Sequence, residues 1–245
     1  MTGRLIGVGV GPGDPDLITV KGRDALLAAD ALFVPVSVTT TGDDADAGAA
    51  PAPGYAQRVV TAHVPHATPI TRLPFALTGE ARAASWRTAA DRVAEVVEAG
   101  RTAAFATIGD PNVYSTFTHL AREVTRRCPA AAVSTVPGIT AMQDLAARTS
   151  TVLIEHDESL ALLPLTAGLD RVRDALATAD TVVLYKGGRH LPEVQRLLEE
   201  EDRLATAVFG ARLGLDDQDV RDQLPRSPAP YLSTVIVPPS HKDPA

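Results

Sequence analysis

Cysteine is almost absent from this sequence of 245 residues, which contains a single one, Cys128. A lone thiol can form neither a disulfide within the chain nor a cysteine zinc cluster. Cys128 follows a segment with a helical pattern, and burial is the ordinary role of a free cysteine in such a place. We therefore expect a buried thiol rather than a catalytic one.

The histidines lack the spacing of a metal site. Neither the HExxH motif nor another paired ligand spacing occurs among the six of them, which are His63, His66, His119, His156, His190 and His241. We interpret His63 and His66, on either side of Pro65, as loop residues. The sequence predicts no metal site built by the protein.

Aromatic residues make up only 4% of the chain, and the net charge is -7. Nucleic acids and anionic membranes are bound through positive charge, and single strands also through aromatic stacking, so neither partner is expected. No apolar run approaches the length of a membrane span, and Arg4-Leu5-Ile6-Gly7-Val8 favours a strand rather than a signal sequence. We expect a cytoplasmic protein.

Two common catalytic motifs are also missing. No Gly-Lys-Ser or Gly-Lys-Thr follows a glycine-rich loop, which argues against phosphoryl transfer by a Walker motif. The serines Ser85, Ser115 and Ser134 lack the GxSxG elbow of an α/β hydrolase.

Aliphatic residues, in contrast, are abundant, since 45% of the chain is hydrophobic, and they alternate between strand-like and helix-like patterns. In the first half we expect strands at 4–10, 31–36, 58–63, 102–108 and 131–136, with helices at 19–29, 79–99 and 114–127. In the second half we expect strands at 151–154, 181–185, 204–209 and 231–237, with helices at 139–148, 168–177 and 190–200. This rhythm is typical of α/β folds with parallel strands.

The Pro137-Gly138 pair is the best candidate for a domain boundary, because proline and glycine punctuate elements and the pattern restarts after them. We expect domains at 1–137 and 138–245. The segment 37–57, rich in Thr, Gly, Asp, Ala and Pro, predicts a mobile surface loop. In the 79–99 helix, Trp86 lies on the apolar face and is expected in the core, and Gly100 is expected to end the helix.

The N-terminal glycines, Gly7-Val8-Gly9-Val10-Gly11-Pro12-Gly13, follow a strand directly and suggest a dinucleotide-binding loop. That motif requires its last glycine to open a helix, whereas Pro12, Asp14 and Pro15 prolong the loop until Thr19, an expected helix cap. We therefore reject a dinucleotide fold. A tight strand exit and a ligand-contacting loop remain equally open.

A second corner, Gly109-Asp110-Pro111, ends the apolar run 102–108 and precedes a helix. Glycine permits close approach of the backbone to a ligand, and proline suits a first helical turn. The Asp110 carboxylate would lie at the carboxyl end of a strand, where parallel sheets usually bind ligands. An ordinary turn is an equally good interpretation of the tripeptide alone.

Six sequence segments, spread over nearly the whole chain, together resemble a known family. They are GVGPGDPDLIT at 9–19, RLPFALTGEARAASW at 72–86, IGDPNVYSTFTHL at 108–120, VPGITAMQDLAAR at 136–148, TVVLYKGGRHLPEV at 181–194 and PYLSTVIV at 230–237. In this order they closely resemble the tetrapyrrole (corrin/porphyrin, class III) methyltransferase family. Several look most like the branch that methylates ring carbon 20 of precorrin-2, although Leu77 and Leu232-Ser233-Thr234 depart from its pattern.

The resemblance implies two α/β domains, each a mostly parallel or mixed sheet flanked by helices, with S-adenosylmethionine folded in the cleft between them. It also implies S-adenosylhomocysteine as product, a tetrapyrrole substrate and a homodimer. The cofactor-binding residues that it implies are Pro12, Ile108, Gly109, Asp110, Val113, Ser115, Thr116, Thr140, Ala141, Tyr185 and Lys186. Backbone amides, hydroxyls and the small Ala141 suit the carboxylate, ribose and adenine of this ligand.

The sequence does not identify a catalytic base. Asp110, Tyr114 and His119 are candidates, with cofactor binding or helix packing as equally good roles. A substrate with several carboxylates would need cations, for which Arg72, Arg148 and Arg189 are candidates, although solvated surface arginines are more common. Two other functions stay open: methylation of a cobalt-loaded ring or another ring carbon, and a noncatalytic nucleotide-sensing module that uses the same cleft.

Overall fold

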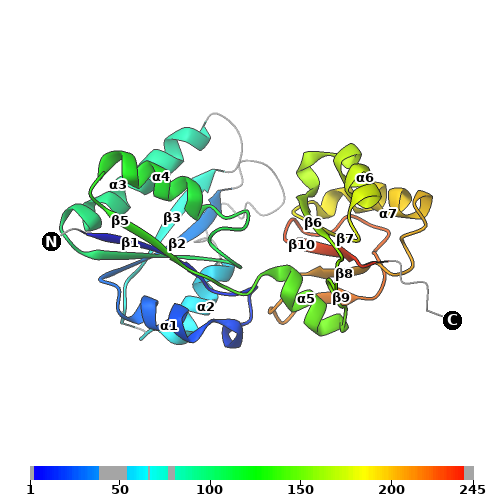
Figure 1. Cartoon of the computed structure of the whole chain (residues 1–245). Helices are drawn as coiled ribbons and strands as arrows, with labels where there is room; N and C mark the ends of the chain where they lie inside the picture. The colour runs from blue at the N-terminus through cyan, green and yellow to red at the C-terminus, as the bar shows by residue number, and fades with distance from the viewer. Residues whose placement is uncertain (1–2, 39–53, 66, 77–80, 240–245) are drawn as a thin grey trace. The chain divides into compact units, whose positions relative to one another are not determined.

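A computed structural model describes residues 3–38, 54–65, 67–76 and 81–239 of the chain (Figure 1). The chain forms two compact units, Met1–Thr140 and Ala141–Ala245. Most of the 37–57 segment, together with His66, Leu77 and His241, lies outside the described residues. The expected mobile loop at 37–57 therefore stays a prediction. The expected domain boundary at 137/138, close to the division between the two units, also stays a prediction.

Unit 1 contains a sheet of five parallel strands in the order β3-β2-β4-β1-β5. The strands are β1 (Arg4–Gly9), β2 (Ala31–Val38), β3 (Ile70–Ala76), β4 (Thr102–Thr107) and β5 (Ala132–Val136). The helices are α1 (Val20–Leu27), α2 (Tyr55–His63), α3 (Ala81–Glu98) and α4 (Phe117–Arg127), with a short 3-10 turn at Pro15–Leu17. Parallel strands need crossover connections, and helices supply them here.

Helices cover both faces of this sheet (Figure 1). On one face, α3 and α4 bury a core around Phe75, Phe105 and Phe117, and on the other, α1 and α2 pack against the aliphatic side chains of β1, β2 and β4. Trp86 belongs to the first core and is 8% exposed, which confirms the sequence prediction. Burial on both faces explains why the central strands read as continuous apolar runs.

Two helix ends follow their sequence signals. The hydroxyl of Thr19 accepts a hydrogen bond from the amide of Gly22 at 3.0 Å, so α1 has the expected N-cap. Gly100 ends α3 with a φ of 73°, the left-handed conformation of a C-terminal glycine.

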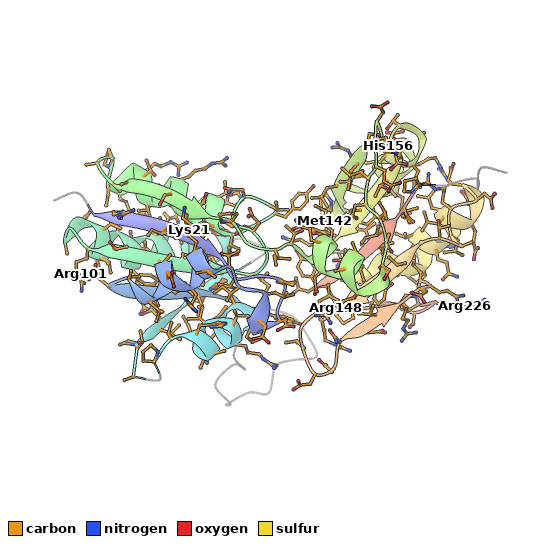
Figure 2. All side chains as sticks on the ribbon, turned by 60° about the horizontal axis from the view of Figure 1, so that its bottom comes forward. Lys21, Arg101, Met142, Arg148, His156 and Arg226 are labelled. Atoms are coloured by element: carbon orange, nitrogen blue, oxygen red, sulfur yellow. The ribbon has the colours of Figure 1, made fainter. Side chains whose placement is uncertain are left out.

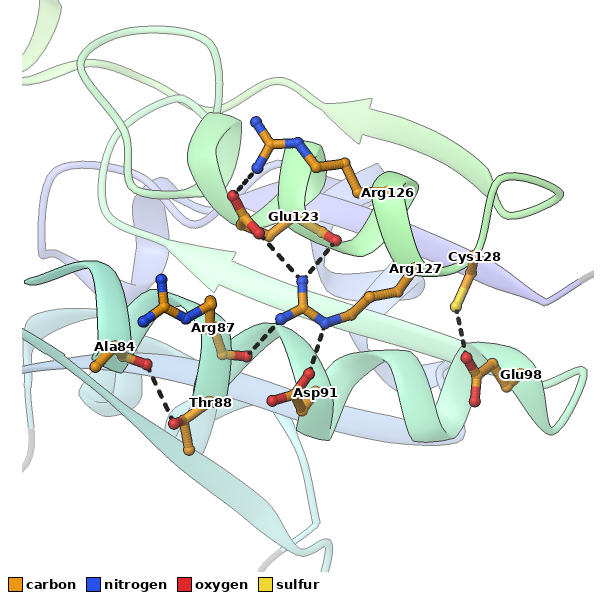
Figure 3. A network of polar contacts seen from close by, with 9 residues as sticks. All are labelled: Ala84, Arg87, Thr88, Asp91, Glu98, Glu123, Arg126, Arg127 and Cys128. Carbon is orange, nitrogen blue, oxygen red and sulfur yellow. Dashed lines mark hydrogen bonds and ion pairs between the residues drawn. The ribbon is translucent and has the colours of Figure 1, made fainter.

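Arg127 joins α4 to α3 (Figure 3). Its guanidinium donates to a carboxylate oxygen of Asp91 at 2.5 Å, to the carboxylate and main-chain oxygens of Glu123, and to the main-chain oxygen of Arg87. Next to it, the buried thiol of Cys128 donates to Glu98 at 3.3 Å. Helices α3 and α4 are thus joined by polar contacts as well as by packing.

Unit 2 contains a mixed sheet in the order β6-β7-β10-β8-β9, in which only the β6–β7 pair is parallel. Its strands are β6 (Leu160–Pro164), β7 (Thr181–Tyr185), β8 (Val208–Ala211), β9 (Asp219–Arg221) and β10 (Ser233–Val237). Its helices are α5 (Ala141–Thr149), α6 (Leu169–Thr178) and α7 (Leu191–Glu200), with 3-10 turns at Leu165–Ala167 and Gly188–His190. Helices α6 and α7 share a core with one face of the sheet, and α5 packs against β8, β9 and β10. The expected fold class is confirmed.

Two predicted strands are wrong. Residues 58–63 belong to helix α2, because Ala56, Val59 and Val60 form one buried face at helical spacing. Residues 151–154 form no ladder, and Val152 and Ile154 are about half exposed. Their β-branched, apolar character resembles a strand, but no strand among the residues that the structure describes pairs with them.

Candidate functional site

Three glycines meet where the adjacent strands β4, β1 and β5 of unit 1 end. Gly9 is the last residue of β1, Gly109 follows β4, and Gly138 follows β5. A methyl group added to Gly9 would lie 2.6 Å from the Gly109 oxygen and 2.6 Å from the Gly138 nitrogen, so no side chain fits. The N-terminal glycine loop also contains the positive backbone angles that a tight strand exit needs, with φ values of 83° at Gly11 and 149° at Gly13.

Backbone hydrogen bonds fix the loops of this glycine junction, which we define as Gly9, Gly109 and Gly138. Gly109 donates to the Gly11 oxygen at 2.7 Å, in an isolated bridge between the two loops. Val10 donates to the Thr107 oxygen at 3.0 Å. Gly109 has a φ of 66°, which favours glycine at the corner. The result is a rigid surface at the carboxyl edge of the sheet, where parallel sheets bind ligands.

Asp110 connects two of these loops. One carboxylate oxygen accepts from the amide of Gly138 at 3.0 Å, and the other accepts from the amide of Asn112 at 2.8 Å. The side chain that the sequence assigns to a ligand is therefore already engaged by the backbone on both oxygens. These hydrogen bonds hold the corner after β4 against the loop after β5.

Ser115 has a similar local role. Its hydroxyl accepts from the Phe117 amide at 3.1 Å and is 2.9 Å from the hydroxyl of Thr107. It thus satisfies one of the unpaired amides at the start of α4 and links that helix to the end of β4. Thr116 precedes α4 without a hydrogen bond from its side chain to the helix.

The other predicted cofactor residues of unit 1 surround the same edge. Pro12 is buried in the glycine loop, whereas Ile108 and Val113 are half-buried in the corner after β4. Thr140 is 7% exposed, and a methyl group on Gly109 would lie 4.0 Å from its Cα. The structure therefore brings the corner of Gly109 and the Thr140 segment next to each other.

The remaining catalytic candidates lie on the α4 side of this edge. Tyr114 has a φ of 45°, an uncommon conformation for an aromatic residue, and is 41% exposed. His119 is exposed in the first turn of α4, with its ring edge-on to Trp86 at 4.9 Å. Trp86 also contacts Phe75 at 4.7 Å. The helix-packing role that the sequence left open is thus visible for His119.

In unit 2, Tyr185 and Ala141 are connected through the residue after Ala141. The amide of Met142 donates to the Tyr185 hydroxyl at 2.9 Å. Figure 2 shows Met142 in the first turn of α5. Lys186 follows β7 in a left-handed conformation with a φ of 57°, and burial lowers the pKa of its ammonium group.

The arginine candidates for substrate carboxylates all have partners within the chain. Arg72 donates to the side-chain oxygen of Gln57 at 2.8 Å. Arg148, which Figure 2 shows on α5, pairs with Asp144 at 2.8 Å. Arg189 donates to the ring of His190 at 3.0 Å. These contacts orient the guanidinium groups but do not assign them to a substrate.

Sequence reasoning missed two residues that shape the site. Asn112 donates from its side chain to the Thr135 hydroxyl at 3.3 Å, in addition to its amide bond with Asp110. Its position two residues after an aspartate is the spacing of an Asx turn and could have identified this amide bond. The bond from Met142 to Tyr185 spans 43 residues and had no local signal.

An open groove of about 540 Å³ runs between α4 and the edge strand β5. It begins at Asn112 and is lined further along by Arg122, Arg126, Ser134 and Thr135. Its residues extend along both elements away from the glycine junction. The groove therefore adjoins the candidate site without containing it.

The chemistry of the junction fits a ligand such as S-adenosylmethionine. Its loops carry two carboxylates, those of Asp14 and Asp110, and negative charge is compatible with a ligand of net positive charge. Hydroxyls and main-chain amides at the same edge suit a carboxylate, a ribose and an adenine.

Across the described part of the chain, no three metal-binding side chains gather, and no helix is long and apolar enough to cross a membrane.

Comparison with known proteins agrees with this architecture. Residues 4–225 match the model of the family described as Tetrapyrrole (Corrin/Porphyrin) Methylases. The precorrin-2 C(20)-methyltransferase of a Sinorhizobium species is 33% identical over 241 residues, which cover 96% of this chain and 95% of the relative. The cobalt-precorrin-2 C(20)-methyltransferase of Salmonella typhimurium is 29% identical, with 97% of each chain covered.

Solved structures share the fold. The methyltransferase CobJ superposes with a TM-score of 0.68 at 20% identity, covering 98% of this chain and 95% of that one. The cobalt precorrin-4 methyltransferase CbiF gives a TM-score of 0.65 at 19% identity, with 96% and 94% covered.

Proposed function

Because the chain belongs to the tetrapyrrole (corrin/porphyrin) methylase family, we propose that it methylates ring carbon 20 of precorrin-2 in cobalamin biosynthesis, with S-adenosylmethionine as methyl donor. The observation that carries this proposal is the full-length similarity to the Sinorhizobium enzyme, which has this reaction in its name. The glycine junction of unit 1 supplies a physical basis for donor binding.

We assign donor binding to the residues that the resemblance implies: Pro12, Ile108, Gly109, Asp110, Val113, Ser115, Thr116, Thr140, Ala141, Tyr185 and Lys186. The bound donor supplies a methyl group on a positively charged sulfur, which is electrophilic without any covalent step on the protein. Asp110 and Ser115 act by holding loops, because their polar atoms already bind the backbone. Their loops then present main-chain groups to the ligand in a fixed geometry.

Catalysis by this chain is mainly positioning. The donor methyl and the acceptor carbon must be held about 3–3.5 Å apart in line, which removes translational freedom from the reaction. After transfer, a proton leaves the ring carbon. Tyr114 and His119 are better candidates than Asp110 to accept it, since both Asp110 oxygens accept backbone hydrogen bonds.

The cobalt-loaded ring is the second candidate substrate. It is favoured by the Salmonella relative, whose name specifies cobalt-precorrin-2. The two substrates are distinguished by giving the purified chain precorrin-2 with and without inserted cobalt and comparing initial rates. The tetrapyrrole that is methylated at the higher initial rate is the substrate.

A mass assay separates the enzyme from a noncatalytic nucleotide-sensing module. The chain is incubated with S-adenosylmethionine and precorrin-2, and the tetrapyrrole is analysed by mass spectrometry. A gain of one methyl group supports the enzyme. Binding of the donor without any change of the tetrapyrrole would support the sensor instead.

We also propose that the protein acts as a cytoplasmic homodimer. This proposal rests on the family resemblance, and light scattering after gel filtration tests the oligomeric state. A monomer at micromolar concentration would contradict it.

A further inference from the structure

The hydroxyl group of Tyr185 has a partner in the protein, although the family resemblance implies that this residue binds the cofactor. It accepts the amide hydrogen bond of Met142 at 2.9 Å. The residue is the last of β7 and is 8% exposed, so its side chain is buried. Little of its surface is left for stacking on a ligand.

The bond fixes the start of α5. The first amides of a helix have no hydrogen-bond acceptor within the helix. The Tyr185 hydroxyl is the acceptor for the amide of Met142. Met142 follows Ala141 directly, and Ala141 begins α5 after the Thr140 segment. Holding Met142 therefore holds the backbone of Ala141, which belongs to the proposed donor site.

The other end of the bond is equally constrained. Lys186 donates its amide to the Ser233 oxygen of β10 at 3.3 Å and adopts a left-handed conformation. A methyl group added to the next residue, Gly187, would overlap the side chain of Leu165. The turn after β7 is thus anchored to the sheet, and the Tyr185 hydroxyl transmits that anchoring to α5.

On the basis of the proposed function, we propose that Tyr185 is a positioning residue, whose hydroxyl holds the first turn of α5 against the end of β7 so that Ala141 and Lys186 together bind the methyl donor. It acts through these neighbours and not through a contact of its own with the donor.

The test is Tyr185→Phe in the full chain, which removes the hydroxyl and keeps the ring. Loss of one hydrogen bond to a partly buried amide predicts that KM for S-adenosylmethionine and Kd for S-adenosylhomocysteine rise about fivefold to twentyfold. At saturating donor, kcat stays within about twofold of the wild type, because no group that touches the reacting atoms has changed.

Thr181→Val is the matched control. Thr181 begins the same strand, is fully buried, and donates to the Leu153 oxygen at 2.6 Å. The variant also removes one buried hydroxyl, but at the opposite end of β7. We expect a lower melting temperature in both variants and an altered KM only in Tyr185→Phe.

Equal KM values for the wild type and Tyr185→Phe would overturn the inference, and so would equal increases in both variants, since general loosening would then explain them. A fall in kcat with unchanged KM would overturn it as well. Failure of the proposed function looks different, because the wild type itself would then neither bind S-adenosylhomocysteine nor methylate precorrin-2.

Discussion

Both carboxylate oxygens of Asp110, a residue of the proposed donor site, face the backbone of the protein. One oxygen accepts a hydrogen bond from the amide of Gly138, and the other accepts one from the amide of Asn112. Hydrogen bonds to a carboxylate are stronger than those to a neutral acceptor, and an amide left unpaired costs further free energy. The arrangement of two loops therefore depends on one side chain.

Asp110→Asn tests this role at nearly constant size. The asparagine amide group can accept through only one oxygen, so one of the two backbone amides loses its acceptor. We expect donor affinity to fall about tenfold or more, which corresponds to roughly 1.5 kcal/mol or more. Calorimetry with S-adenosylhomocysteine measures the affinity, and far-ultraviolet circular dichroism verifies the fold. Unchanged affinity would show that the loops keep their arrangement without the carboxylate.

Cys128 gives a second prediction for a single residue. Burial is the first cause that raises the pKa of its thiol, and the hydrogen bond to Glu98 adds to it. The thiolate is the reactive form, so the native protein should react slowly with a thiol reagent at pH 8, and the unfolded protein rapidly. Rapid labelling of the native protein would mean that the thiol is accessible.

At the scale of elements, the glycine junction determines whether the loops after β1, β4 and β5 can meet. In Gly138→Ala, the added methyl group would lie 2.7 Å from the Gly9 carbonyl carbon, which belongs to a central strand and cannot move away cheaply. Overpacking of this kind costs typically about 1–3 kcal/mol. Urea unfolding should show a loss in this range. A stability equal to that of the wild type would mean that the junction is looser than described.

The α3–α4 pair predicts a dependence on pH. The hydrogen bond from Arg127 is the main cause that lowers the pKa of Glu123 below its ordinary value of 4.5. A carboxyl with a lowered folded-state pKa stabilises the protein above its unfolded pKa, and this contribution is lost as the pH falls through the folded value. Stability should therefore decline from about pH 4.5 downward.

Glu123→Gln isolates this contribution. The variant should be less stable than the wild type at pH 6 and should lose less stability on acidification, so that the two curves of melting temperature against pH converge. Parallel curves would show that Glu123 contributes nothing to the acid response.

The sequence predicted the central strands better than the edges. Strands β1, β4, β7 and β10 are buried apolar runs, and each was expected near its observed position. The missed strands β3, β6 and β9 all lie at sheet edges. Pro74 lies within β3 and Pro164 is the last residue of β6. Proline is tolerated at a sheet edge because one side of the strand needs no ladder.

The prediction of a strand at 58–63, where the structure has helix α2, failed for another reason. Val59 and Val60 favour a strand by propensity, but their burial together with Ala56 follows the period of a helix. Tertiary packing overrode the local preference. In the candidate site, residue types were predictable from the motifs, whereas the pairing of Asp110 with Gly138 or of Met142 with Tyr185 depends on contacts between distant segments.

For the whole molecule, each unit has its own hydrophobic core: around the two faces of the parallel sheet in unit 1, and around α6, α7 and the mixed sheet in unit 2. Predicted donor residues are divided between them, with Gly109 and Asp110 in one unit and Tyr185 and Lys186 in the other. Each unit alone lacks some of these implied residues, so we expect neither one alone to bind the donor with full affinity. Calorimetry on the separately produced units tests this expectation.

The central claim is tested most directly by following the transferred carbon. The chain is given precorrin-2 and S-adenosylmethionine with a 13C-labelled methyl group, and the product is examined by NMR. The account predicts one new labelled methyl group, bonded to ring carbon 20. A labelled methyl group on any other ring carbon, or none in the tetrapyrrole while the donor is bound, would contradict it.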